Sequence, residues 1–189
     1  MPRLFTAIEL PDDVKAELYQ LNLPLPGARW IKPEDYHLTV RFVGDVDAAH
    51  AREFAANAAS FEIEVFELRI SGVGVFGGND PSTVFANVEL TPPLEALARA
   101  HEKAARNAGL PPDKRPFKPH VTLARLRNSD AAAVARYLTR FGGYRSEPFF
   151  VSHVALMSSK PGIGGGPYGI EDIFPLRGGA AMLDEASRW

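Results

Sequence analysis

The feature that most limits how this chain can fold is a similarity between its first and second halves. The stretch FTAIEL at residues 5–10 resembles FANVEL at residues 85–90. HLTV at residues 37–40 resembles HVTL at residues 120–123. The two matches have nearly the same spacing along the chain, which favours a tandem duplication over the chance recurrence of short helices and strands.

Each half is predicted to run as strand, helix, strand, helix, strand. Residues 3–10 are an apolar-rich strand candidate, and the proline and acidic residues that follow signal the start of a helix. Asp47 and Asp130 are separated by the same number of residues as the HLTV and HVTL stretches. Both are expected to cap helices, because a short carboxylate accepts hydrogen bonds from the first backbone N–H groups of a helix. The third strand is expected within 62–75 in the first half and within 149–158 in the second.

A duplicated chain normally packs its halves about an approximate twofold axis, with equivalent strands facing each other across it. The sequence therefore predicts an α+β fold of two similar lobes, each an antiparallel sheet with helices on its outer face. A groove between the lobes would hold the functional site. We expect residues 1–189 to form this one bilobal domain, with repeats at approximately 1–80 and 81–160, then a C-terminal strand and tail.

Two glycine-rich stretches mark expected joints. Residues 77–81, GGNDP, are dense in turn formers and fall at the boundary between the repeats. Residues 160–167, KPGIGGGP, are predicted to form a hairpin loop before a strand at 168–176. A phosphate-binding loop is the alternative for this second stretch, but it lacks a Gly-Lys-Ser/Thr ending and a helix after it. Residues 178–189 are expected to be a small docked or frayed tail.

The two His-x-Thr pairs are the strongest functional signal. In an extended strand His37 and Thr39 share one face while Leu38 points into a core, and His120 and Thr122 share a face in the same way. One such pair could be no more than two polar residues on a solvated face of a strand. Two pairs on equivalent strands indicate one shared site in the groove between the lobes.

Composition excludes several classes of function. Because the chain has no cysteine, it has no disulfide, no thiolate nucleophile and no Cys-ligated zinc, which is typical of a reducing compartment. No apolar run reaches membrane length, so we expect a cytoplasmic protein with no membrane partner and no obligate protein partner. The formal net charge of −2 argues against a protein that coats nucleic acid, although it permits a site for one phosphate.

Basic residues are concentrated around the second motif. A solvated basic loop is the simple explanation, and a phosphate site is the alternative. The residues concerned are Lys114, Arg115, Lys118, Arg125 and Arg127.

Two imidazoles and two hydroxyls suit proton transfer better than covalent catalysis. One neutral histidine can accept a proton while a charged one donates a proton, as an in-line displacement at a phosphodiester requires. Threonine hydroxyls and a nearby arginine would stabilise the phosphoryl oxygens without a cofactor or metal. A zinc site built on His37 and His120 is the alternative, but no third ligand lies at suitable spacing beside either motif.

The other three histidines are expected to have no part in the chemistry. His50 and His101 lie in helical stretches rich in alanine and charge, which predicts surface positions. His153 lies in a strand with no matching threonine, which predicts a hydrogen-bonded structural role.

These stretches resemble the two-histidine phosphoesterase superfamily, and within it the RNA 2′,3′-cyclic phosphodiesterases first known as 2′-5′ RNA ligases. The similarity covers nearly the whole chain, and the stretches that carry it are FTAIEL, RWIKPEDYHLTVRFVGDV, FKPHVTLAR, Tyr168 and Phe174-Pro175-Leu176. The resemblance implies a bilobal duplicated fold that uses no metal. It also implies RNA ends or nucleotides with a 2′,3′-cyclic phosphate as substrates, opened to leave a 2′-phosphomonoester.

Carried onto matching positions, the resemblance makes His37 the proton donor to the departing 3′ oxygen and His120 the proton acceptor from water. Thr39, Thr122 and Arg125 would bind the phosphoryl oxygens.

Strict alternation places Arg125 away from the groove, so we expect either a bulge after Leu123 or action from beyond the strand end. The same alternation turns Arg41 toward the groove, and Phe42 could stack on a terminal base only if its strand bends.

Three other functions stay open. Two are enzymatic, namely a ligase of 2′-5′ linkages and a phosphodiesterase for small cyclic nucleotides. The third is a non-catalytic module that binds RNA ends or nucleotide phosphates. Intact copies of both motifs favour catalysis over binding alone.

Overall fold

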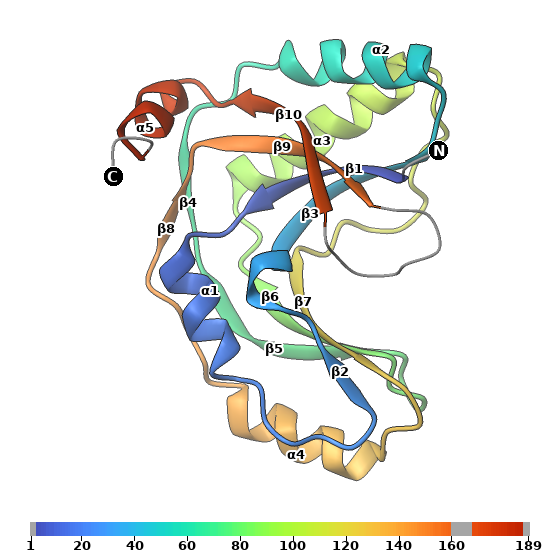
Figure 1. The fold of residues 1–189 in the computed structure, drawn as a ribbon, viewed down its shortest axis with the longest axis vertical. Helices are drawn as coiled ribbons and strands as arrows, with labels where there is room; N and C mark the ends of the chain where they lie inside the picture. The colour runs from blue at the N-terminus through green and yellow to red at the C-terminus, as the bar shows by residue number, and fades with distance from the viewer. Residues whose placement is uncertain (1–2, 160–167, 187–189) are drawn as a thin grey trace.

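The computed structural model describes residues 3–159 and 168–186, as an α+β fold with a large antiparallel sheet (Figure 1). The elements in chain order are β1 (Arg3–Glu9), α1 (Asp12–Tyr19), β2 (Ala28–Trp30), the short 3₁₀ helix η1 (Pro33–Asp35), β3 (His37–Asp45), α2 (Ala48–Ala59), β4 (Phe66–Leu68), β5 (Ile70–Phe76), β6 (Thr83–Val88), α3 (Pro92–Asn107), β7 (His120–Leu126), α4 (Ala131–Phe141), β8 (Phe149–Val151), β9 (His153–Ser159), β10 (Tyr168–Pro175) and α5 (Gly179–Ala186).

The main sheet has eight strands in the order β10-β9-β1-β3-β7-β6-β5, with β2 paired to β7 beside this path. All of its strand pairs are antiparallel. At the centre β3 and β7 meet only at Leu38 and Val121, so the sheet consists of two parts joined at one point. The predicted fold class, with two lobes, is confirmed.

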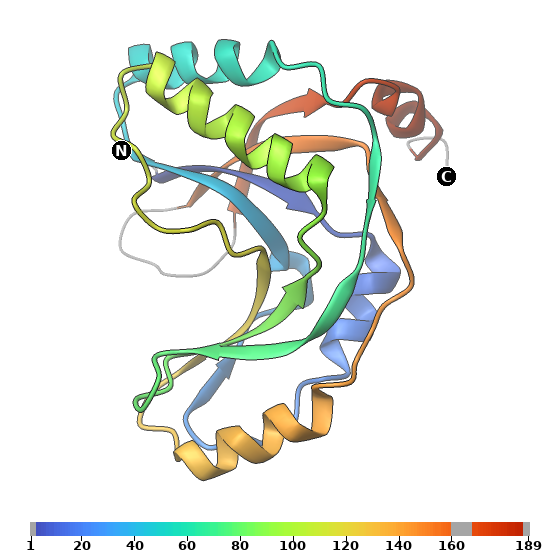
Figure 2. The ribbon, with the colours of Figure 1, turned by 180° about the vertical axis from the view of Figure 1, so that it is seen from behind.

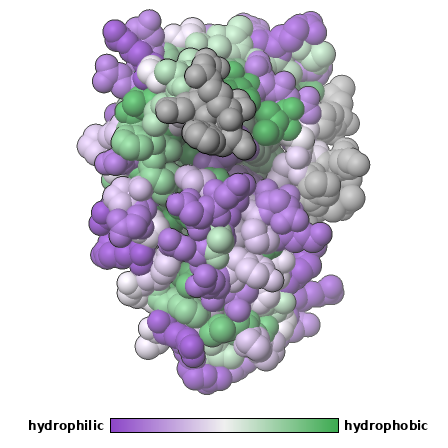
Figure 3. Space-filling view, turned by 60° about the vertical axis from the view of Figure 1, so that its left-hand side comes forward, coloured by the Kyte–Doolittle hydropathy of each residue, from purple (hydrophilic) through white to green (hydrophobic). Residues whose placement is uncertain are grey.

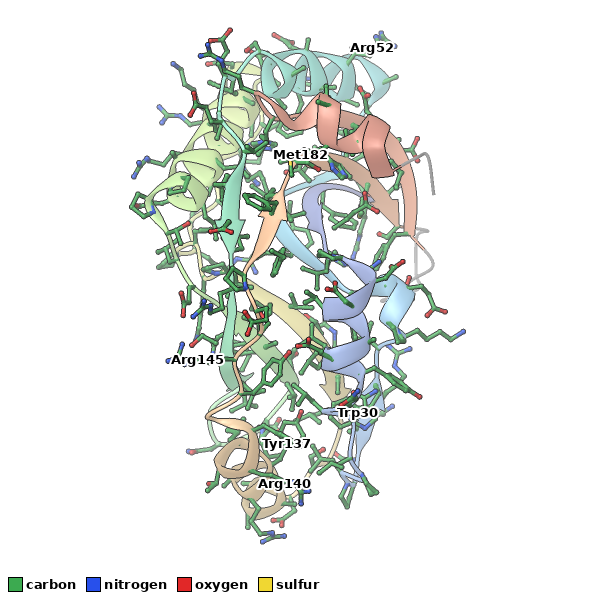
Figure 4. All side chains as sticks on the ribbon, turned by 90° about the vertical axis from the view of Figure 1, so that its left-hand side faces the viewer. Trp30, Arg52, Tyr137, Arg140, Arg145 and Met182 are labelled. Atoms are coloured by element: carbon green, nitrogen blue, oxygen red, sulfur yellow. The ribbon has the colours of Figure 1, made fainter. Side chains whose placement is uncertain are left out.

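Helices cover one face of each part (Figures 1 and 2). In the first lobe, α2 and α3 pack on each other, and they contact β10 and β3 respectively. In the second lobe, α4 packs on β5, and the Tyr137 hydroxyl donates a 3.1 Å hydrogen bond to the Leu21 carbonyl just after α1. Trp30 lies beside Tyr137, with ring centroids 5.7 Å apart, close to α4 (Figure 4).

Each lobe contains strands from both halves of the chain. β5, from the first half, pairs with β6 of the second half, while β9, from the second half, pairs with β1 of the first. The connecting segments β4 and β8 pair with each other as a separate two-stranded sheet. Each expected third strand is therefore divided into two. Its first part, β4 or β8, lies in the small sheet, and its second part, β5 or β9, joins the main sheet.

Two strand contacts have the form that a twofold axis requires. Leu38 pairs with Val121, and Glu67 pairs with Phe150, so that each residue meets its equivalent in the other half of the chain. A twofold axis brings a residue on the axis against its own equivalent. These contacts support the duplication, which stays a prediction.

The helices begin and face as the sequence indicates, with one exception. Asp47 accepts hydrogen bonds from the backbone of α2, and Asp130 does so from α4, so both predicted caps are confirmed. His50 is exposed, as predicted. His101 is only 2% exposed and faces the sheet, where its Nδ1 lies 3.0 Å from the hydroxyl of Thr6. The prediction of a surface position for His101 was wrong, because its helical spacing from the buried leucines of α3 places it on their face.

The first of the two glycine-rich joints forms the turn that the sequence predicts. Residues 77–81 form the predicted turn between β5 and β6, in which Gly77 and Gly78 have positive φ angles and the Asp80 N–H donates to the Gly77 carbonyl. The glycine-rich stretch 160–167 lies outside the described residues. The described part of the expected tail contains α5.

Hydrophilic residues cover much of the middle of the side shown in Figure 3, and hydrophobic surface gathers above and below them. None of the helices in residues 3–159 and 168–186 combines the length and the apolar character needed to cross a membrane.

Candidate active site

His37 and His120 are the first residues of β3 and β7, next to the single contact between these strands. The fold therefore brings together two residues that come from different halves of the chain. They are close enough that positive charge on His120 helps to lower the pKa of His37. We call the sheet face that carries both histidines the site face.

The backbone fixes the orientation of both imidazoles in the same way. His37 Nδ1 lies 2.8 Å from the Asp35 carbonyl oxygen, and His120 Nδ1 lies 2.7 Å from the Lys118 carbonyl oxygen. A carbonyl only accepts hydrogen bonds, so each Nδ1 carries a hydrogen and donates it. Each Nε2 is then the atom that gains or loses a proton, as a general acid or base requires.

Two aromatic rings pack against each imidazole. The ring centroid of His37 lies 5.1 Å from that of Phe5 and 4.8 Å from that of Tyr168, and these two rings also contact each other. The ring centroid of His120 lies 5.2 Å from that of Phe85 and 4.9 Å from that of Phe76, and these two rings are stacked on each other. Tyr168 and Phe76 each meet their histidine edge to face.

Burial in these surroundings is the main cause that lowers the pKa of each histidine below its ordinary value. The carbonyl hydrogen bond on Nδ1 acts in the opposite direction in both cases. Neutral imidazoles are thus favoured, and mutual repulsion disfavours charging both at once.

The two threonines follow on the same face. Thr39 and Thr122 are half-buried, two residues beyond their histidines. Within residues 3–159 and 168–186, neither hydroxyl has a hydrogen-bond partner. Both hydroxyls are therefore able to donate to an anionic ligand on the site face.

A bulge interrupts both strands at the same place. In β7 the partners of Val84 and Phe85 are Ala124 and Thr122, so Leu123 has no partner on β6. In β3 the same irregularity leaves Val40 without a partner on β1. Both residues stand three positions after a histidine. An extra residue in one strand shifts the alternation of the side chains that follow it.

The bulge brings Arg125 to the site face, which agrees with the first of the two arrangements expected for it. Its Nη1 donates a 3.0 Å hydrogen bond to the hydroxyl of Thr83 on β6. Its charge contributes to lowering the pKa of both His37 and His120. One cation therefore lies near both histidines.

The equivalent bulge in β3 exchanges the expected places of Arg41 and Phe42. Phe42 lies on the site face, 52% exposed, with its ring centroid 6.0 Å from that of Phe5. Arg41 turns to the opposite face, where its Nε donates a 2.6 Å hydrogen bond to Glu102 of α3. The expectation that Arg41 faces the groove was wrong, because strict alternation does not hold past Val40.

The aromatic residues around the histidines were not assigned to the site by the sequence analysis. Phe5 and Phe85 occupy the same position in FTAIEL and FANVEL, so the repeat held a signal for them. Phe76 and Tyr168 are far from either motif in sequence and reach the site only through strand pairing. Tyr168 also donates its backbone N–H to the Asp35 carboxylate, whose pKa burial raises.

His153 is hydrogen-bonded, as predicted. Its Nε2 lies 2.9 Å from Glu9, and its Nδ1 lies 3.0 Å from the Ser152 hydroxyl. Among the described residues no three His, Asp or Glu side chains gather in a way that could hold a metal ion. Metal independence itself stays a prediction.

Comparison with known proteins identifies the family of this chain. The sequence profile of the 2′-5′ RNA ligase superfamily matches residues 11–162. The chain belongs to the 2′-5′ RNA ligase superfamily. The resemblance to the two-histidine phosphoesterases is thereby confirmed, and the protein is a member of a phosphoesterase family.

Relatives in this superfamily are similar over most of the chain. The RNA 2′,3′-cyclic phosphodiesterase of Thermus thermophilus is 31% identical over 188 residues, which cover 93% of this chain and 91% of the relative. The Bacillus subtilis protein of the same name is 30% identical over 130 residues, which cover 66% of this chain and 71% of the relative.

Solved structures share the fold. TT0787 of Thermus thermophilus superposes with a TM-score of 0.76 at 25% identity, and the match covers 93% of this chain and 98% of that one. Escherichia coli LigT in complex with 3′-AMP superposes with a TM-score of 0.76 at 24% identity, covering 93% and 99% of the two chains.

Proposed function

We propose that the protein is a metal-independent RNA 2′,3′-cyclic phosphodiesterase that leaves a 2′-phosphomonoester. The observation that carries this proposal is the matched fixing of His37 and His120, each of which donates from Nδ1 to a carbonyl and so keeps Nε2 for proton transfer. Arg125 lies near both. The names of the relatives support the same activity.

The reaction needs one neutral and one protonated imidazole. His120, neutral, accepts a proton at Nε2 from the attacking water, whose oxygen forms a bond to phosphorus. The bond from phosphorus to the 3′ oxygen breaks, and that oxygen takes the Nε2 proton of His37. The proton added to His120 and the proton lost by His37 balance, so bulk water restores both for the next turnover.

Positive charge and hydroxyl groups would stabilise the phosphoryl oxygens during this step. Thr39 and Thr122 supply neutral donors, and Arg125 supplies a charged one. The matched positions of His37 and His120 at the starts of β3 and β7 support an in-line reaction, in which the two imidazoles would act from either side of a central phosphate. The assignment of acid to His37 and base to His120 comes from the family resemblance.

Incubation of the purified protein in EDTA with an oligoribonucleotide ending in a 2′,3′-cyclic phosphate tests the proposal. We expect a 2′-phosphomonoester, identified by phosphorus NMR. Loss of activity in EDTA with recovery in zinc would overturn metal independence. Tight binding without turnover would favour a phosphate-binding module, and joining of an added 5′-hydroxyl strand would favour a ligase.

A further inference from the structure

Arg29 lies on β2, a three-residue strand that sequence analysis missed. β2 runs antiparallel to β7, with Ala28 opposite Leu126, Arg29 opposite Arg125 and Trp30 opposite Ala124. Arg29 is thus the direct cross-strand neighbour of Arg125, the arginine proposed to bind the reacting phosphate. Adjacent strands are about 4.8 Å apart, so the two backbones hold these arginines close together.

The side chain of Arg29 belongs to the site face. Trp30 packs against Tyr137 of α4, on the helix-covered face of the sheet. Because successive side chains of a strand point to opposite faces, Arg29 points to the other face, with Arg125. Arg29 is also exposed.

Like charges directly opposite each other on paired strands are destabilising. Burial raises the pKa of Tyr168 and the Asp35 carboxylate adds to this, whereas the charges of Arg125 and Arg29 both act to lower it. Two arginine charges therefore act at this edge of the site. A guanidinium has five N–H donors in a planar fork, so one arginine can bind both a protein group and a ligand. An anion between the two arginines would remove their repulsion.

We infer that Arg29 binds the phosphodiester that precedes the reacting phosphate in an RNA strand. The inference rests on the proposed function, in which Thr39, Thr122 and Arg125 hold the reacting phosphate. Along β7 the neighbour changes from β3, at Leu38, to β2, at Arg29. An RNA strand that leaves the histidines in this direction along β7 passes Arg125 and then reaches Arg29. A single nucleotide has no phosphate to place there, so Arg29 favours RNA ends over free cyclic nucleotides.

The test compares two substrates, cytidine 2′,3′-cyclic phosphate and a tetranucleotide that ends in the same group. Arg29→Gln should lower the ratio of the two kcat/KM values, oligonucleotide over mononucleotide, by about tenfold, because a charge-assisted hydrogen bond is lost from one substrate only. It should also reduce the slope of log kcat/KM against log salt for the tetranucleotide by about 0.7, the value for one phosphate contact on a single strand.

Arg52→Gln is the matched control. It removes the same charge from the outer helix α2 (Figure 4), so the ratio and the salt slope should stay at their original values. Arg29→Lys keeps the charge without the planar fork and should keep the salt slope while losing part of the ratio.

Three outcomes separate this inference from its competitors. Equal losses on both substrates would overturn it, because Arg29 would then act only by positioning Arg125. Unchanged kinetics on both would overturn it in favour of a surface arginine. If the unaltered protein hydrolyses neither substrate, the proposed function fails. Fluorescence anisotropy then measures the affinities for a tetranucleotide 2′-phosphate and for cytidine 2′-phosphate. The effect of Arg29→Gln on the ratio of these two affinities decides the role of Arg29.

Discussion

His37 and His120 begin equivalent strands, and each donates its Nδ1 hydrogen to the carbonyl two residues before it. Each packs against a phenylalanine from the same position of its repeat, Phe5 or Phe85. Each is followed, three residues later, by a bulge. These shared features depend mainly on the backbone, which places the two imidazoles in matching orientations.

The side chains around the two histidines differ. The residue brought to the site face by the bulge is Phe42 on the His37 side and Arg125 on the His120 side. The ring that meets the histidine edge to face is Tyr168 on the first side and Phe76 on the second. A symmetrical backbone therefore carries an asymmetrical site, with aromatic surface suited to a base on one side and positive charge suited to phosphate on the other.

Removing either histidine should have the largest effect. His37→Ala and His120→Ala should each lower kcat about 10²–10⁴-fold, the usual range for a positioned acid or base. A substrate whose 3′ oxygen is replaced by sulfur has a leaving group that scarcely needs a proton. It should rescue His37→Ala and not His120→Ala. Rescue of the His120 variant alone would exchange the two roles, and rescue of neither would indicate hydrogen bonding without proton transfer.

Removing the cation on the His120 side should have the next largest effect. Arg125→Ala should lower kcat/KM about 10²-fold, because a charged donor to the phosphoryl oxygens is lost. Arg127→Ala, two residues further along, should leave kcat/KM nearly unchanged. Equal and small losses for both variants would mean that the basic residues around the second motif form a solvated loop.

A buried polar pair behind the His37 side has no counterpart behind the other. Thr6 and His101 are hydrogen-bonded there, whereas the equivalent positions of the opposite repeat hold Ala86 and Leu21, both buried. Burial lowers the pKa of His101 to about 4, so the folded protein keeps it neutral while the unfolded chain protonates it near pH 6.5. The contribution of neutral His101 to the free energy of unfolding is therefore complete above pH 6.5 and is lost as the pH falls toward 4.

Chemical denaturation measures this difference. The free energy of unfolding should fall by about 2 kcal/mol between pH 7 and pH 5 because of His101. The double variant Thr6→Ala/His101→Leu, which copies the other side, should lose this part of the pH dependence. An unchanged pH dependence would show that the pKa of His101 is the same in the folded and the unfolded protein.

The aromatic residue on the His37 side should matter for binding more than for chemistry. Phe42→Ala should raise KM about tenfold with little change in kcat, because stacking on one base contributes roughly 1–3 kcal/mol. Arg41→Ala is the neighbouring control, and its effect should be on stability, through the lost contact with Glu102. A fall in kcat for Phe42→Ala with KM unchanged would contradict a stacking role.

The smallest effect concerns the pH profile. Because the pKa values of both histidines are lowered, the bell-shaped profile of kcat/KM should have its maximum below about pH 6.5, and its two limbs belong to the coupled pair. Arg125→Gln removes a charge that lowers both pKa values, so both limbs should move to higher pH by less than about one unit. Movement of one limb alone would show that Arg125 acts on one side only.

The sequence predicted the features that repeat and missed those that depend on strand pairing. Both His-x-Thr strands, both Asp caps and the α+β class follow from local patterns. The bulges arise between neighbouring strands, so alternation within β3 alone gave the wrong face for Arg41. β2 has three residues, too few for a periodic pattern. The sequence did hold a signal for His101, because its helical spacing from Leu94 and Leu97 marks the buried face.

The exchange of β5 and β9 between lobes has a consequence for how the chain folds during synthesis. When the first half has left the ribosome, β1 still lacks its neighbour β9, and β5 lacks its neighbour β6. Contacts between residues so distant in sequence are slow to form, and unpaired strand edges invite aggregation. The nascent first half should therefore depend on chaperones until Ser159 has emerged, and two fragments divided at the Gly77–Gly78 turn should gain structure only when mixed.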